Sequence, residues 1–172
     1  MERFAKIFIA AIFLVTISSC DRKSCKNVVC ASYQTCYEGQ CLCPDGYQGA
    51  NCDSLSSTQY TGTWNVTENC GNGVPPNATG YQVYIQPAIS PVNYITISNL
   101  LNMATVNAQI YNTTPGNEGQ SIYIAAASQG GFSISNSYGT YSTASGTPVI
   151  SLILNYNLNG INYTCQETMY KQ

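Results

Sequence analysis

VISLILNYNLNGINYTCQE, residues 149–167, contains the clearest structural pattern in this chain. Apolar and polar side chains alternate on both sides of the dipeptide Asn159-Gly160. Alternation of this kind is the pattern of a β-strand with one buried face. Asn-Gly is the preferred pair for a two-residue hairpin turn, in which both residues take a positive φ. The stretch therefore predicts a hairpin whose first strand buries Ile150, Leu152 and Leu154, and whose second strand has Ile161, Tyr163 and Cys165 on one face.

The same alternation recurs throughout residues 60–172, without any helical periodicity. Further runs occur at 60–68, 80–86, 93–98, 104–111, 120–125 and 131–137. Together with the hairpin they predict about eight strands and a mainly β, antiparallel domain. Residues 98–103, SNLLNM, break the pattern, and we expect Leu100 and Leu101 to plug one end of the core.

Two cysteines indicate how this β-domain closes. Cys70 follows the first predicted strand, and Cys165 lies in the last one. A disulfide between them would bring their Cα atoms to about 5.5 Å, so the first and last strands would be neighbours. Eight strands whose ends meet form a closed barrel, which also removes the exposed sheet edges. A β-sandwich whose terminal strands meet across two sheets is the alternative.

The N-terminal residues have the pattern of an export signal. Arg3 and Lys6 precede an apolar run of eleven residues, Ile7–Ile17. This run has the length of a secretory h-region and falls short of the roughly 20 residues that span a bilayer. Ile17-Ser18-Ser19-Cys20 resembles the lipobox of bacterial lipoproteins. The alternative is an ordinary signal peptide with a cysteine near its cleavage site.

The lipobox resemblance implies a signal peptide at 1–19, a lipidated Cys20 and a short tether at 20–24. Removing Cys20 from the nine cysteines leaves eight, a number that can pair completely. The resemblance places the protein at a membrane through its N-terminal lipid, and we expect the outer membrane of a Gram-negative bacterium. The leaflet stays open.

Six of the remaining cysteines lie within 28 residues, Cys25 to Cys52. A segment this short cannot bury enough apolar surface to fold without disulfides or a metal. Export to an oxidising compartment and the lack of paired C-x₂-C spacing favour disulfides over zinc. Fifteen pairings of six cysteines are possible.

The end of this segment, CLCPDGYQGANC at 41–52, resembles an EGF-like domain. It has the C-x-C, the Gly-aromatic pair and a glycine before the last cysteine, and Gly46 and Gly49 suit tight turns. The resemblance implies the pairs Cys25–Cys36, Cys30–Cys41 and Cys43–Cys52. The acidic cluster of calcium-binding members is absent before Cys25, so we expect no metal. The domain would serve as a spacer, followed by a polar linker at 53–59.

The composition argues against catalysis and against nucleic acid as a partner. Only 8% of residues are charged, the net charge is −2, and histidine, the commonest general base, is absent. Glu68, Glu118, Glu167 and Lys171 are the only charged residues after residue 60. Glu68 and Glu167 lie near the meeting strands and could act as a glycosidase pair, but we expect solvated strand-end residues. No enzyme activity and no cofactor are therefore predicted.

Binding is the function class that the sequence favours. Tyr84, Tyr111 and Tyr123 share the outward face of their strands with amide side chains, and such a face can bind a glycan or a protein at the cell surface. Gly62-Thr63-Trp64 resembles the Gly-x-Trp of lipocalins, in which the tryptophan closes one end of the barrel. That resemblance implies a carrier of a small apolar ligand as the alternative function. A structural component of the envelope is a third interpretation.

Overall fold

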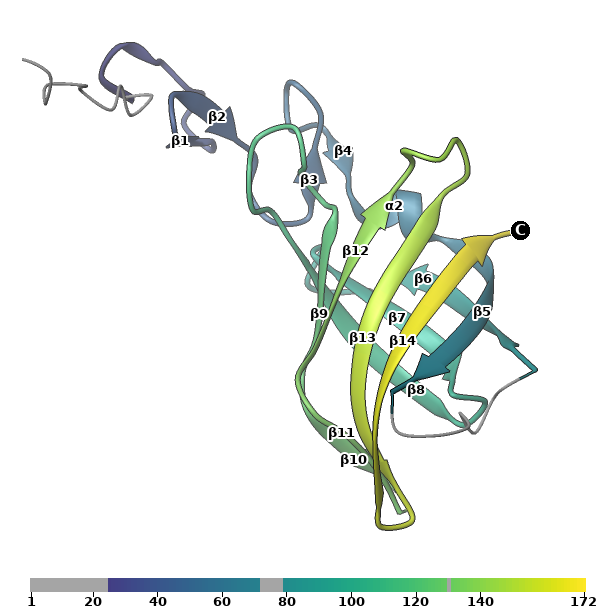
Figure 1. Cartoon of the computed structure of the whole chain (residues 1–172). Helices are drawn as coiled ribbons and strands as arrows, with labels where there is room; N and C mark the ends of the chain where they lie inside the picture. Colours follow the sequence, from purple (N-terminus) through teal and green to yellow (C-terminus); the bar gives the residue numbers. More distant parts are fainter. Residues whose placement is uncertain (1–24, 72–78, 130) are drawn as a thin grey trace, which may run out of the picture.

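The computed structural model describes residues 25–71, 79–129 and 131–172. The expected signal peptide 1–19, Cys20 and the tether 20–24 lie outside these residues. The described chain forms a small disulfide-rich module followed by a β-barrel (Figure 1). Its helices are all too short or too polar to cross a bilayer.

The disulfide-rich module consists of short elements joined by turns. A 3-10 helix, η1 (Cys25–Asn27), precedes two small antiparallel hairpins, β1 (Thr35–Tyr37) with β2 (Gln40–Leu42) and β3 (Tyr47–Gln48) with β4 (Ser54–Leu55). Its disulfides are Cys25–Cys36, Cys30–Cys41 and Cys43–Cys52, the same pairs that the EGF-like resemblance implies. Gly46 and Gly49 have φ values of 89° and 91°, which residues with a side chain rarely adopt.

The segment expected as a linker, 53–59, is folded in the structure. β4 pairs with β3 of the module, and the short helix α2 (Ser57–Tyr60) follows directly. Tyr60 is fully buried in the core of the barrel. The linker therefore joins the two parts through ordered structure.

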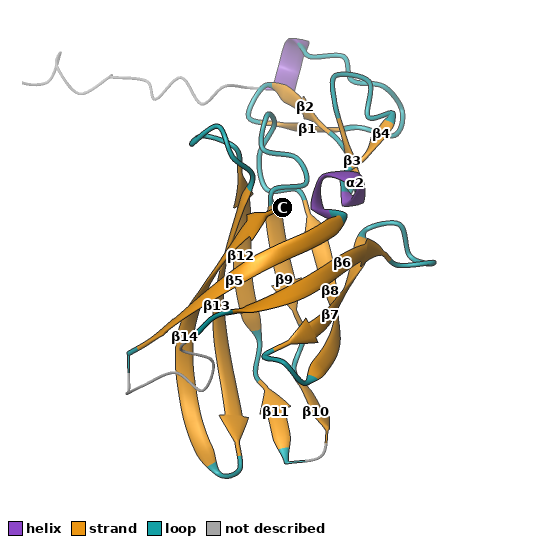
Figure 2. Cartoon of the chain, turned by 90° about the vertical axis from the view of Figure 1, so that its right-hand side faces the viewer, coloured by secondary structure: helices purple, strands orange, loops and turns teal. Residues whose placement is uncertain are grey.

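Eight strands form a closed antiparallel barrel, which confirms the predicted fold class and excludes the sandwich. The strands are β5 (Gly62–Cys70), β6 (Tyr81–Pro87), β7 (Tyr94–Leu100), β8 (Ala104–Tyr111), β9 (Ser121–Ile124), β12 (Ser137–Ser142), β13 (Val149–Leu158) and β14 (Ile161–Lys171). Each pairs with the next in this order, and β14 pairs with β5 (Figure 2). The disulfide Cys70–Cys165 joins directly opposed residues of these two closing strands.

The predicted hairpin at 149–167 is present. Leu158 of β13 pairs with Ile161 of β14, and Asn159 and Gly160 have φ values of 52° and 86°. The turn extends beyond the barrel, so Ile161 is 56% exposed and the buried face of β14 begins further along the strand. That face consists of Cys165, Glu167 and Met169.

One wall strand differs from the prediction, although the barrel has about the predicted number of strands, eight, and β10 and β11 lie outside it. The run at 131–137 contributes only β11 (Phe132–Ile134), which pairs with β10 (Ala127–Gln129) and with the end of β13 as an extension of the wall. The wall strand is β12, whose sequence SYGTYS has weak apolar alternation. A Cβ on Gly139 of β12 would lie 2.7 Å from the Leu152 side chain, so tight packing favours glycine at this position. This glycine is one reason why the apolar alternation of β12 is weak in the sequence.

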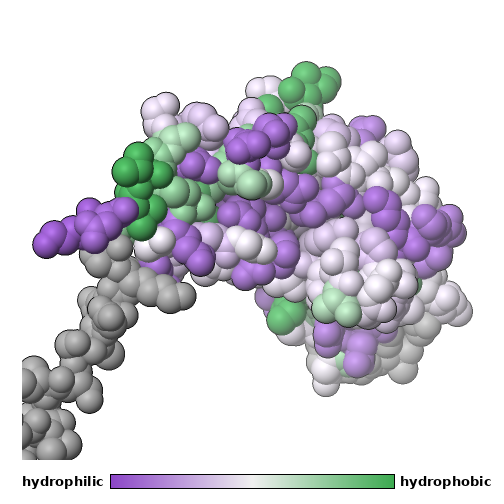
Figure 3. Space-filling view, turned by 90° about the horizontal axis from the view of Figure 1, so that it is seen from above, coloured by the Kyte–Doolittle hydropathy of each residue, from purple (hydrophilic) through white to green (hydrophobic). Residues whose placement is uncertain are grey.

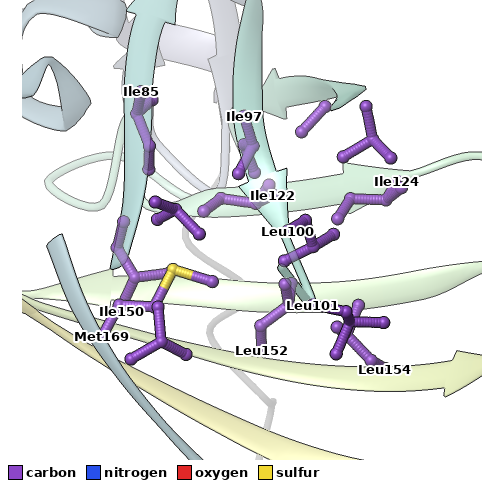
Figure 4. Close-up of a cluster of buried hydrophobic side chains, with 14 of the residues drawn as sticks. Ile85, Ile97, Leu100, Leu101, Ile122, Ile124, Ile150, Leu152, Leu154 and Met169 are labelled. Atoms are coloured by element: carbon purple, nitrogen blue, oxygen red, sulfur yellow. The ribbon is translucent and has the colours of Figure 1, made fainter. Parts of the chain in front are cut away.

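Branched apolar side chains fill the barrel interior (Figure 4). Leu100 and Leu101, at the turn from β7 to β8, are fully buried and plug one end of the core, as predicted. The other end of β8 leads to Asn112, which contacts the module, so the leucines close the end away from the module. Trp64 closes the other end: it is fully buried, its Nε1 donates to the Tyr60 carbonyl at 2.7 Å, and its ring contacts that of Tyr141. The interior is therefore a packed core with an aromatic cap at one end and a leucine plug at the other.

Candidate binding face

Three neighbouring strands bring tyrosines together on the outer wall of the barrel. Tyr111 of β8, Tyr123 of β9 and Tyr138 of β12 line a shallow hollow of about 320 Å³ with Gln109. The ring centroids of Tyr123 and Tyr138 are 5.1 Å apart. The Tyr123 hydroxyl also donates to Asn136 Oδ1 at 2.9 Å, which fixes the direction of its ring. The hollow therefore presents oriented aromatic surface to solvent.

The sheet register explains why these side chains meet. Directly opposed residues on adjacent strands lie on the same face of the sheet, with Cβ atoms about 4.5–5.5 Å apart. From β7 to β14 the successive cross-strand partners form one line of outward side chains. We call it the wall row, and it consists of Tyr94, Gln109, Tyr123, Tyr138, Ile153 and Gln166.

A second hollow of about 300 Å³ adjoins the first. It shares Tyr111 and Tyr138 with the first hollow and continues over Thr140, Ser151 and Ile153. Tyr138 and Ile153 are 55% and 56% exposed, although both are large apolar or aromatic side chains. The two hollows therefore form one continuous candidate binding face that crosses the strands.

The outer wall around this face carries no charge. The charged residues after residue 60 are Glu68, Glu118, Glu167 and Lys171, and none lies in β6 to β13. Lys171, near the end of β14, donates its ammonium to the Gln59 carbonyl at 3.1 Å and lies over the Trp64 ring. The groups that the strands β6 to β13 present on this outer wall are therefore aromatic rings, amides, hydroxyls and aliphatic side chains, without a charged side chain.

Of the three tyrosines that the sequence predicted for an outward binding face, the structure brings two together. Tyr111 and Tyr123 both line the face, whereas Tyr84 is 49% exposed on β6 and lines neither hollow. Sequence reasoning missed Tyr138 and Ile153. Tyr138 lies in β12, a strand that the sequence analysis did not predict. A predicted strand at 137–142 would have placed Tyr138 on the outward face beside Tyr123.

The expectation that Glu167 is a solvated strand-end residue is wrong. Glu167 is fully buried in the barrel and is the direct cross-strand partner of Glu68, which is half-buried. The Tyr81 hydroxyl donates to Glu167 Oε2 at 3.4 Å, and the Tyr156 hydroxyl donates to Glu68 Oε1 at 2.5 Å. Burial, with the charge of Glu68 beside it, raises the pKa of Glu167 to about 8.

This carboxyl pair is enclosed and lies apart from the binding face. Glu68 also lies within 4.8 Å of the sulfur atoms of Cys70 and Cys165, a grouping that resembles a metal-binding cluster. Both sulfurs are bonded in the disulfide, so neither can act as a thiolate ligand. The pair can share a proton, and its surroundings supply no metal-binding set.

No family model matches the sequence, and a search of curated proteins finds no match.

Proposed function

We propose that this protein is a non-catalytic, lipid-anchored envelope lipoprotein that binds a neutral glycan through the wall row of its barrel. The lipobox resemblance supports a lipid on Cys20 and an address at the outer membrane of a Gram-negative bacterium. The module, EGF-like by its spacing and glycines, would hold the barrel away from the lipid.

The observation that carries the proposal is the uncharged wall row, in which three tyrosines, two glutamines and Ile153 form one line across six strands. Tyrosine rings offer flat contact area at a low cost in conformational entropy. Glutamine side chains donate and accept hydrogen bonds, as sugar hydroxyls do. A charged ligand would meet no opposite charge on this wall. A neutral glycan matches all three properties.

The lipocalin-like alternative has less support. A carrier needs space inside the barrel, and an eight-stranded barrel is only just wide enough for one small ligand. Here the interior holds large side chains such as Trp64, Ile122 and Leu152, each with at most 1% of its surface exposed. Leu100 and Leu101 block the end away from the module. The outer wall is therefore the better candidate.

An array of immobilised neutral glycans, followed by calorimetry with each hit, tests the proposal. Tyr138→Ala removes the central ring of the wall row and is expected to weaken binding about tenfold or more. Tyr84→Ala is the matched control, because it removes an exposed outer-wall tyrosine outside both hollows. Equal binding by wild type and Tyr138→Ala, or binding only to a protein ligand, would overturn the glycan proposal.

The anchor needs a separate experiment. Incorporation of radiolabelled palmitate by the wild type and its loss in Cys20→Ser would support lipidation. A mature chain that carries no label, or a Cys20→Ser chain that keeps it, would contradict it.

A further inference from the structure

A groove of about 760 Å³ lies where the disulfide-rich module meets the barrel. Three segments line it: the module with β4, Gln59 of α2, and the 112–120 loop that joins β8 to β9. Its lining includes Gln34, Gln40, Gln48, Gln59, Glu118 and Gln120. Seen from above, hydrophilic residues gather between the module and the barrel (Figure 3).

Asn112 holds the two sides of this groove together. Its side-chain amide donates to the carbonyls of Cys43, Pro44 and Tyr47 in the module, at 2.9 to 3.0 Å. Its backbone N–H donates to Asp45 Oδ1 at 2.7 Å. Its Oδ1 accepts from the N–H of Gly119 within the 112–120 loop. The hydrogen bonds of Asn112 therefore fix the position of the 112–120 loop against the module, on the two sides of the groove.

The groove contains amides that are free to bind a ligand. The side chains of Gln40, Gln48 and Gln120 make no hydrogen bond to any other residue in the described part of the chain, whereas Gln59 donates to the Gly119 carbonyl at 2.6 Å. The one carboxylate, Glu118, accepts from the Gly116 N–H at 2.8 Å. Three primary amides, two from the module and one from the 112–120 loop, therefore line one space without intramolecular partners.

We propose that this groove is a second binding site, separate from the wall row, and that it takes a neutral oligosaccharide segment. Each free amide has two donors and one acceptor, which matches vicinal hydroxyls that both donate and accept. Among the residues that the structure describes, no cation lines the groove, and Glu118 would repel a phosphate or carboxylate. A peptide is disfavoured, because the lining has no large apolar side chain among the described residues, and Cys41, Ala50 and Pro115 offer only small apolar contacts for its side chains.

Saturation-transfer NMR and calorimetry on the full chain, with a panel of neutral gluco-, manno-, galacto- and N-acetylglucosamine oligosaccharides, test this site. The double variant Gln48→Ala/Gln120→Ala is expected to lose affinity for at least one bound oligosaccharide by about tenfold or more. Gln86→Ala, an exposed glutamine on the outer wall, is the matched control and should bind as the wild type does.

The two sites are distinguished with Tyr138→Ala. An oligosaccharide that depends on Gln48 and Gln120 but not on Tyr138 supports the groove even if the wall row binds nothing. If no oligosaccharide of the panel binds, or if every bound one is insensitive to the double variant, the groove proposal is overturned. Loss of binding to a random peptide library in the double variant would overturn the saccharide class.

Discussion

Glu167 of β14 and Glu68 of β5 face each other across the closing strands of the barrel, two positions from the disulfide Cys70–Cys165. Tyr81 and Tyr156 donate their hydroxyls to this pair, and burial raises the pKa of both tyrosines, so they stay protonated donors. Ionising both carboxyl groups costs free energy, because they lie beside each other and burial shields them from water. The closing seam of the barrel therefore contains a proton-binding pair.

The first prediction is that stability decreases as the pH rises towards alkaline values. The pKa of Glu167 is raised from 4.5 to about 8, so the folded state binds its proton more tightly than the unfolded state does. This stabilisation is fully present below pH 4.5 and is lost as the pH rises through 8. The free energy of unfolding should fall by up to about 1.4 kcal/mol per pH unit within this window.

Urea unfolding of wild type and Glu167→Gln across this window tests the prediction. The glutamine cannot ionise, so its stability should change less with pH and should exceed that of the wild type at pH 8. Glu118→Gln, in the 112–120 loop away from the carboxyl pair, is the control and should follow the wild type. Parallel pH profiles for wild type and Glu167→Gln would contradict the role of this carboxyl.

The second prediction concerns the disulfide Cys70–Cys165. Its partners are 95 residues apart in the sequence, and the cross-link removes much of the freedom of the unfolded chain. The double variant Cys70→Ala/Cys165→Ala should lose about 3–5 kcal/mol of the free energy of unfolding. Denaturant unfolding under non-reducing conditions measures this loss. A loss below about 1 kcal/mol would show that the strand pairing alone closes the barrel.

The third prediction concerns the leucine plug. Leu101 is fully buried, with φ 57° in the turn between β7 and β8. Leu101→Ala should destabilise the barrel by about 2–4 kcal/mol, because it leaves a cavity at the closed end. Met103→Ala, at a side chain that is 50% exposed in the same turn, should cost less than about 0.5 kcal/mol. Similar thermal unfolding midpoints for the two variants would show that burial of Leu101 does not stabilise the barrel.

The fourth prediction concerns the junction of the module and the barrel. Asn112→Asp replaces an amide that donates to three carbonyls with a carboxylate that repels them. Hydrogen exchange should accelerate at residues 43–47 and 112–119, while the barrel strands keep their protection. Asn107→Asp on the outer wall is the control, since Asn107 Oδ1 only accepts from Thr96. Unchanged exchange at 43–47 would mean that Asn112 does not hold the module.

Local patterns in the sequence predicted much of this fold. Asn159-Gly160 forms the expected hairpin because its turn needs two positive φ values, which these residues tolerate. The positions of Cys70 and Cys165 predicted that the first and last strands meet, and the barrel closes there. These features were predictable because each depends on a few neighbouring residues or on a single covalent link.

Features that depend on tertiary packing were missed. Glu167 has the same strand parity as Cys165 and Met169, but its charge argued for solvent, and only the fold shows the partners that compensate its burial. β12 was missed because Gly139 makes room for Leu152 on another strand. Tyr138 was lost from the predicted face with that strand. Asn112 acts through contacts with a module about 65–70 residues earlier, which no local pattern indicates.

An NMR titration of the tyrosine ring signals with each neutral glycan that the array identifies most directly tests the face formed by the wall row and Tyr111. The account predicts that the shifts concentrate on Tyr111, Tyr123 and Tyr138, while Tyr84 on the same outer surface does not respond. Shifts centred on Tyr84, or no response of any tyrosine to any neutral glycan, would contradict it.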